Sequence, residues 1–367
     1  MHGSTNKPLT TWSLAALALS LATAINCPAR PPVRLDPDFD RSGNILISDQ
    51  FNNRVVEVMP NGRIVWQYGN GSEDFSGASP VGVNDAERIH TSTLIACTGT
   101  PAGLIPEAPD GVADNRVILV DQFGNTLWQY GQFGQTGDGF NLLNVPVQAT
   151  WLPTSHVLIT DQGNNRIIEV NSVKAIVWSF PGTNIDDNAQ LNSPNSAELL
   201  ANGHILIADE NNNRVIEVDR ADNVLKTYTA GDTLGAVAFA SRLPNGHTLI
   251  TDAGNSRAVE VTTNDVVFWQ YYTDTDPNSV AAPAPTRALR LAGGNTIISD
   301  QFNNRVIVVN AKGKIVSSYG LPLAGGDVIG NNVGYDLKTV QKGLYSPYDA
   351  KVVGDFTGIT PLFMFRF

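Results

Sequence analysis

Short apolar and alternating segments, separated by turns, recur along the whole chain. In one unit, Ile45–Asp49 is an apolar run that ends at a turn aspartate, and Arg54–Val58 alternates with period two. A turn at 60–62 leads into Ile64–Tyr68, which alternates again. Alternation with period two is typical of β-strands, and short apolar runs bounded by turn residues indicate buried strands. The unit therefore predicts three consecutive strands.

The unit is repeated around a shared core, D-x-x-N-N-R. Its aspartates are Asp49, Asp161, Asp209, Asp252 and Asp300, and its arginines are Arg54, Arg166, Arg214, Arg257 and Arg305. The last four aspartates are 48, 43 and 48 residues apart, and an interrupted copy lies between the first two. This period, with several strands in each copy, is typical of a propeller. Because these residues recur, we interpret them as structural: the carboxylate accepts turn N–H groups, and the guanidinium links strands.

A further strand, with the pattern x-x-A-x-x-apolar, precedes each copy. The segment 348–353 has the same form, but no copy follows it. We therefore predict an all-β fold, a six-bladed β-propeller of four-stranded blades whose ring is closed by the C-terminal inner strand. The alternative is that 33–39 supplies the first inner strand, so that seven blades form and the last is incomplete. Closure is favoured because it removes exposed sheet edges.

The motif D-x-x-N-N-R-[VI]-x-E-V, preceded by G-[NH]-x-L-I, resembles the NHL repeat of six-bladed propellers. The W-x-Y-G endings at Trp66 and Trp128 also resemble the propellers of bacterial arylsulfotransferases and quinone-binding proteins. The resemblance covers nearly all of the chain after residue 24. It implies the fold but selects no function, because NHL-type propellers include scaffolds, protein binders, lactonases, amidating lyases and RNA-binding modules.

The first 24 residues are predicted to be an export signal. Lys7 precedes the apolar run 12–21, which is too short to span a bilayer, and 22–24 reads as an A-x-A cleavage site. A cytosolic N-terminal helix is the alternative. We thus expect one propeller domain over 25–367 in a secreted or periplasmic protein, where Cys27 and Cys97 either pair or stay separate thiols.

The charge narrows the range of partners. The net charge is -11 and no basic run occurs, so we expect no nucleic-acid partner. No membrane span is expected, and a closing aromatic segment at 361–367 is interpreted as a last strand or a packed tail.

The polar residues that flank the inner-strand alanines differ from blade to blade, as a ligand site on the ring axis requires. They are Asp85, Glu87, Gln148, Glu198, Arg287 and Asp349. Carboxylates with an arginine could hold a cation such as Ca²⁺, or clamp an anionic or sugar-like ligand at the channel mouth. The alternative is a water-filled polar channel with internal ion pairs.

Two patterns suggest metals but are interpreted otherwise. His156, His204 and His247 share one position, and three histidines are a common zinc ligand set, but Asn44 and Asn295 hold that position in other blades. The carboxylates in 36–43 alternate as in a calcium loop, but the loop lacks the required glycine and glutamate. We assign no metal ligand.

The lengths of two loops indicate which face of the propeller binds a ligand. The insertion 98–113 joins a second strand to a third, and 320–346 joins an outer strand to the next inner one, so both emerge on the same face of a propeller. We expect a scaffold that binds a protein, glycan or small molecule there. The alternative is a propeller enzyme of the lactonase or other hydrolase, lyase or arylsulfotransferase kind, with a polar or metal site at the channel mouth.

Overall fold

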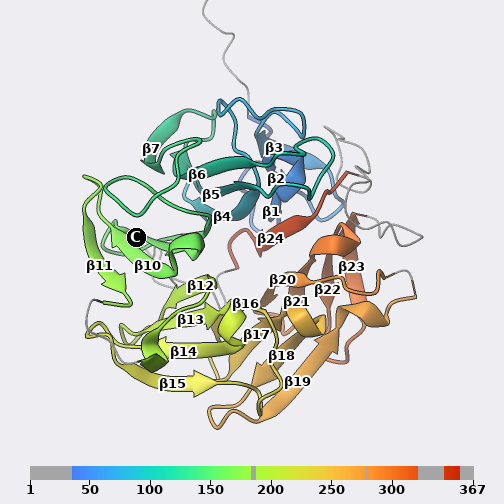
Figure 1. Cartoon of the computed structure of the whole chain (residues 1–367). Helices are drawn as coiled ribbons and strands as arrows, with labels where there is room; N and C mark the ends of the chain where they lie inside the picture. Colours follow the sequence, from blue (N-terminus) through green and yellow to red (C-terminus); the bar gives the residue numbers. More distant parts are fainter. Residues whose placement is uncertain (1–34, 183–186, 278, 321–342, 356–367) are drawn as a thin grey trace, which may run out of the picture. The chain divides into compact units, whose positions relative to one another are not determined.

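The computed structural model describes residues 35–182, 187–277, 279–320 and 343–355. These residues make one compact unit, in which six four-stranded antiparallel sheets surround an axis (Figure 1). The predicted all-β, six-bladed propeller is confirmed. The expected export signal, Cys27, the segment 361–367 and nearly all of 320–346 lie outside the described residues. In the described part of the chain, no helix is long and apolar enough to cross a membrane.

Each blade runs from an inner strand through two middle strands to an outer strand. The inner strands are β4 (Val83–Ile89), β8 (Pro146–Trp151), β12 (Pro194–Leu199), β16 (Val237–Arg242), β20 (Pro285–Arg290) and β24 (Pro347–Val352). The second strands are β1 (Ile45–Asp49), β5 (Ser92–Thr100), β9 (Val157–Asp161), β13 (Ile205–Asp209), β17 (Thr248–Asp252) and β21 (Thr296–Asp300). The third strands are β2 (Arg54–Val58), β6 (Val112–Val120), β10 (Arg166–Val170), β14 (Arg214–Val218), β18 (Arg257–Val261) and β22 (Arg305–Val309). The outer strands are β3 (Ile64–Tyr68), β7 (Thr126–Gly131), β11 (Ile176–Phe180), β15 (Val224–Tyr228), β19 (Val267–Tyr272) and β23 (Ile315–Gly320).

The C-terminal strand closes the ring, as predicted. β24 pairs with β1, with Ile47 opposite Ala350, and the six inner strands contact one another in order round the axis. The seven-blade alternative is wrong, because residues 35–39 are in no strand. Phe39 instead packs on Trp66 of the outer strand β3, with 6.1 Å between ring centroids.

The core lies between neighbouring blades. Ile47 and Val56 of the first blade pack with Ile297 and Val306 of the sixth, and equivalent clusters fill the other blade interfaces. Both faces of the middle strands are therefore buried, which explains their nearly continuous apolar runs. Burying one such side chain fully contributes about 1.5–3 kcal/mol.

Candidate functional site

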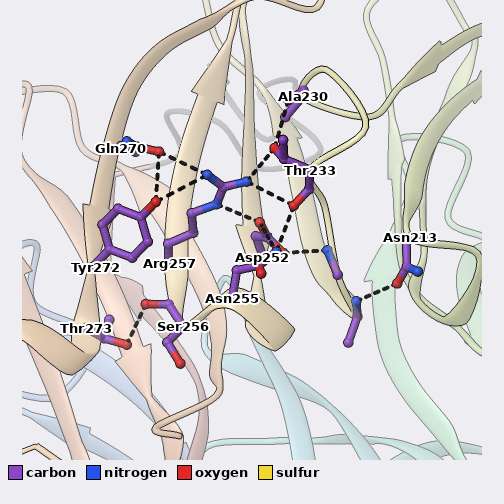
Figure 2. A network of polar contacts seen from close by, with 12 residues as sticks. Asn213, Ala230, Thr233, Asp252, Asn255, Ser256, Arg257, Gln270, Tyr272 and Thr273 are labelled. Atoms are coloured by element: carbon purple, nitrogen blue, oxygen red, sulfur yellow. Dashed lines mark hydrogen bonds and ion pairs between the residues drawn. The ribbon is translucent and has the colours of Figure 1, made fainter. Parts of the chain in front are cut away.

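The repeated motif lies where the second strand turns into the third, and blade five displays its contacts (Figure 2). Arg257 Nε donates to the Asp252 carboxylate at 2.6 Å, and the Gly235 N–H donates to the same carboxylate at 2.8 Å. Asn213 of the preceding blade accepts a hydrogen bond from the Ala236 N–H at 2.8 Å. The aspartate and asparagine of successive copies thus hold the connection between two blades from both sides.

These bonds recur round the ring. The aspartate accepts the N–H of the connection that leads into its own blade in the pairs Asp49–Tyr345, Asp161–Asn144 and Asp209–Asn192. The asparagine accepts the N–H of the next connection in the pairs Asn53–Gly82, Asn115–Val145, Asn165–Ser193 and Asn304–Ser346. The geometry therefore supports the structural interpretation of the repeat.

Blade two keeps these bonds despite its insertion. Cys97 takes the strand position opposite Arg116 that Asp49 takes opposite Arg54 in blade one. The carboxylate comes instead from Asp114, which pairs with Arg116 at 2.5 Å and accepts the Val81 N–H at 2.8 Å. The insertion therefore lengthens this blade without weakening its attachment.

The three repeated histidines have separate partners. Each Nδ1 lies 2.6–2.7 Å from a glutamate of its own blade, in the pairs His156–Glu169, His204–Glu217 and His247–Glu260. Arginines of the next blade, Arg220, Arg242 and Arg290, bind the same glutamates. The histidines therefore belong to links between blades and form no zinc site.

The calcium-like loop is also paired within the protein. The Arg63 guanidinium lies 2.6 Å from both Asp36 and Asp38. Within the described ranges, no three His, Cys, Asp or Glu side chains are grouped as a metal site would need.

Five of the six predicted channel residues accept a backbone N–H from the neighbouring inner strand. The pairs are Asp85–Ala149, Glu87–Trp151, Gln148–Ala197, Glu198–Arg242 and Asp349–Ala86, at 2.7–3.4 Å. An inner strand is the edge of its sheet, and N–H groups on that edge need partners from elsewhere. These side chains supply the partners, so they join one blade to the next.

A lysine occupies the place that a channel cation would take. Lys351 Nζ lies 2.6 Å from both Asp85 and Asp349 and donates to the Ala86 carbonyl at 2.9 Å. Burial raises the pKa of Asp349 to about 6, against the opposing charge of Lys351. Burial alone would lower the pKa of Lys351, but the two carboxylates outweigh it and raise that pKa. The contacts thus describe an internal ion pair, as the alternative for this channel anticipated.

Glu87 lies beside this ion pair, and its pKa is raised further than that of Asp349. Burial raises its pKa to about 8, although Lys351 and the Trp151 N–H act in the opposite direction. Glu87, Glu198 and Lys351 border a cavity of about 10 Å³, which is room for about one water molecule. The cavity is too small for an organic ligand.

Arg287, the sixth predicted residue, spans the axis. Its guanidinium donates to Asn195 Oδ1 and to the carbonyls of Ala238 and Val147 at 3.1–3.4 Å, and its side chain lies over the rings of Phe239 and Tyr348. One side chain of β20 therefore contacts β8, β12, β16 and β24. Since only 1% of Arg287 is exposed, it cannot present its charge to a ligand in solution.

The sequence analysis did not identify a further group of polar side chains near the axis. They belong to the residue that follows the repeated aspartate in each copy. Gln301 donates to Gln50 and Gln50 to Asn84, while Gln162 and Asn195 both donate to Glu210, all at 2.8–2.9 Å. The variation of this position among Gln, Glu and Ala is the signal that could have found it. These side chains therefore bind one another, in most cases between neighbouring blades.

The insertion in blade two packs against the rest of the propeller. Ile105 and Ala108 are buried with Phe51 and Tyr345, whose rings meet edge to face at 5.5 Å. The strands β5 and β6 continue into it, with Thr100 opposite Val112. The insertion is therefore a rigid wall on the face that carries the repeated turns.

A cleft of about 330 Å³ opens between this wall and the connection from β7 to β8. Residues 98–102, 110–113 and Asn115 form one side, and Thr136, Asn144 and Val145 form the other. The cleft lies on the face predicted to bind, and its second side, among the described residues, is the β7–β8 connection. Most of 320–346, the other loop expected on this face, lies outside the described residues. None of the six predicted channel residues is among the described residues that line it.

The polar groups of the cleft have spare hydrogen-bonding capacity. Thr98 donates to the Pro146 carbonyl at 2.6 Å and Thr136 accepts from Asn115 at 2.9 Å, so each hydroxyl can make a further hydrogen bond. Asp110 is exposed at the cleft. Of the described lining residues, none is Lys, Arg, His, Cys or aromatic, and Asp110 alone is titratable. The cleft can therefore bind a polar ligand but offers little for acid–base or nucleophilic chemistry.

The fold and its connections define a six-bladed β-propeller with a cleft on its turn-bearing face. No protein-family model matches the sequence, and no curated protein is similar to it. Among solved structures, a protein of unknown function from Bacteroides caccae is similar, with 14% identity and a TM-score of 0.52 over 81% of this chain and 97% of that one. A catalytically inactive virginiamycin B lyase from Staphylococcus aureus with quinupristin has 11% identity and a TM-score of 0.48 over 78% and 87% of the two chains. A functionally unknown protein from Desulfotomaculum acetoxidans has 14% identity and a TM-score of 0.45 over 79% and 84%. At these identities the likeness concerns the fold alone, and membership of the NHL family stays a prediction.

Proposed function

We propose that this protein is a non-catalytic binding propeller that acts outside the cytoplasm, and that its binding site is the cleft between residues 98–113 and the β7–β8 connection. The observation that carries the proposal is the cleft itself, which lies between a packed insertion and the β7–β8 connection. Its volume of about 330 Å³ is at the small end of ligand pockets, ~300–1,000 Å³, and Asp110 is exposed at it. The axis is a poorer candidate, because its polar side chains already bind one another and the inner strands.

A propeller enzyme with a site at the channel mouth is less well supported. Catalysis by proton transfer needs an acid and a base within reach of the substrate. At the axis, the carboxylates of Asp85 and Asp349 are held by Lys351, and Arg287 is buried. In the cleft, Asp110 has no second titratable side chain beside it among the described lining residues. We therefore assign binding rather than turnover.

A shortened insertion tests the proposal. Replacing residues 101–111 with Asn-Gly keeps Thr100 opposite Val112 and removes one wall of the cleft, because Asn-Gly suits a two-residue hairpin turn. Wild type and variant are screened against one fragment library by ligand-observed NMR, with Glu87→Gln as the control that alters only the axis. The proposal expects the hits to be lost in the shortened variant and kept in the control. Hits that survive shortening but disappear in Glu87→Gln would place binding at the axis and overturn it.

A further inference from the structure

Exposed carboxylates are spread over the turn-bearing face of the propeller, where the cleft opens. They come from the insertion in blade two and from four of the connections that lead from an outer strand to the next inner strand. In the described residues of these segments, the exposed acids are Glu73, Asp110, Asp138, Asp232 and Asp274. None of the five forms an ion pair within the described ranges, so their charges are not neutralised locally.

The cations of this face are already paired within the blades. Away from the axis, the Lys and Arg side chains that the structure describes here are the arginines of the repeat, each bound to an aspartate in the pairs Arg54–Asp49, Arg116–Asp114, Arg166–Asp161, Arg214–Asp209, Arg257–Asp252 and Arg305–Asp300. The segment 321–342, which connects β23 to β24, contains two Asp and two Lys and so adds no net charge. The exposed carboxylates therefore give this face a negative potential that no described cation offsets.

The opposite face of the propeller is mixed in charge. The turns between the third and outer strands lie on it and expose Arg220, Lys312 and Lys314, and Arg41 is exposed there just before β1. Its glutamates are bound by arginines, as Glu169 is by Arg220 at 2.6 Å. The negative potential is therefore a property of the turn-bearing face and does not simply reflect the acidity of the whole chain.

The walls of the cleft suit an aliphatic stem that ends in a cation. Pro101, Ala102, Val112 and Val145 supply small apolar side chains, and Asp110 is the single charged group among the described lining residues. Lysine and arginine side chains lay their apolar stems along such surfaces and keep the charged end near water. A cationic head group in the cleft is attracted by Asp110, whereas an anion meets a negative field without a cation to neutralise it.

We infer that the turn-bearing face binds a basic, extended segment of another protein, which places one lysine or arginine side chain in the cleft; this inference rests on the proposed function. A ligand confined to the cleft contacts Asp110 alone of the five exposed acids. The other four lie on separate connections, so only a partner with several cations along its length meets more than one of them. Complementary charge of this kind selects basic partners and speeds their association.

The experiment compares hexalysine with hexa-acetyllysine, which keeps the backbone and the apolar stems but lacks the charges. Butylamine and spermidine are the small-amine probes. Binding to the whole protein is measured by NMR titration, which follows the backbone amides of residues 98–102. Hexalysine should shift these amides, and hexa-acetyllysine should bind about tenfold more weakly. Raising the salt from about 50 to about 300 mM should also weaken the binding of hexalysine, because salt screens exposed charges.

Two isosteric substitutions separate contact in the cleft from the general field of the face. Asp110→Asn removes the carboxylate in the cleft and should weaken the binding of hexalysine about fivefold, the upper end for one exposed ion pair. Asp232→Asn is the matched control, because it removes the same charge from an exposed position of the same face but on the β15–β16 connection. It should change the affinity less than about twofold. Thermal unfolding of both variants establishes that the fold is intact.

The outcomes distinguish this inference from the proposed function. Equal binding of hexalysine and hexa-acetyllysine, or equal losses in Asp110→Asn and Asp232→Asn, overturns the inference. If butylamine or spermidine shifts residues 98–102 and hexalysine does not, the ligand is a small amine: the inference is overturned and the binding cleft stands. The same holds if members of the fragment library bind in the cleft and no cation does. If neither the cations nor the fragment library perturb residues 98–102, both the inference and the proposed function fail.

Discussion

Replacing Glu87 with Gln should stabilise the protein increasingly as the pH rises. Burial raises the pKa of Glu87 from its ordinary value of 4.5 to about 8. The folded state binds this proton more tightly than the unfolded state does. Protonation of Glu87 therefore stabilises the fold fully below pH 4.5, and this stabilisation is lost as the pH rises towards 8. Each tenfold change in proton affinity corresponds to ~1.4 kcal/mol, so the charged carboxyl destabilises the fold by about 5 kcal/mol above pH 8. A glutamine avoids this cost, and its carbonyl can still accept the Trp151 N–H.

The assay is urea unfolding of wild type and variant between pH 4 and pH 9, evaluated as the difference in the free energy of unfolding. The difference should be small near pH 4, about 3 kcal/mol in favour of the variant at pH 7, and about 5 kcal/mol at pH 9. Glu73→Gln, which changes an exposed carboxyl, is the control and should stay within about 0.5 kcal/mol of wild type. A Glu87→Gln difference that does not depend on pH would refute the reasoning.

Two further substitutions test the ring. Lys351→Met leaves Asp85 and Asp349 buried without their counter-ion and should lower the free energy of unfolding at pH 7 by about 3–5 kcal/mol, with a smaller loss below pH 6 as Asp349 takes up a proton. A loss under 1 kcal/mol at pH 7 in urea unfolding would contradict the ion-pair assignment. Asn304→Ala removes the acceptor of the Ser346 N–H where the chain enters β24, and should cost about 1–3 kcal/mol and speed hydrogen exchange in β24. Unchanged exchange in β24 would argue against a role of this asparagine in ring closure.

The fold was largely predictable because the repeat encodes local contacts. The carboxylate of D-x-x-N-N-R binds the arginine five residues later, so the turn carries its own signature. The segment 348–353 was recognisable as a closing strand because it has the form of an inner strand without a blade to follow. Its pairing with β1, some 300 positions earlier, then followed from the need to cover a sheet edge.

The contacts of the channel residues could not be predicted from the sequence alone. Variation between blades at Glu87 and Gln148 was taken as a sign of a ligand on the axis. Their partners are backbone N–H groups of Trp151 and Ala197, 64 and 49 residues away, and any acceptor of suitable length can serve there. Variation between blades at these positions is therefore expected for this structural role as well as for a ligand site.

The sequence identified 98–113 as an insertion in the repeat, but the cleft beside it could not be predicted. Nothing local in 98–113 indicates that Ile105 and Ala108 pack against Phe51 and Tyr345 from distant parts of the chain. That packing orients the wall, and the cleft exists because the β7–β8 connection faces it. Both facts depend on the closed ring.

The central claim is that ligands bind in the cleft of blade two rather than on the axis. A crystal structure of the protein soaked with the tightest-binding fragment of the library tests it most directly. We expect the fragment between residues 98–102 and Asn144. A fragment found on the axis beside Glu87 and Arg287, with the cleft empty, would contradict the account.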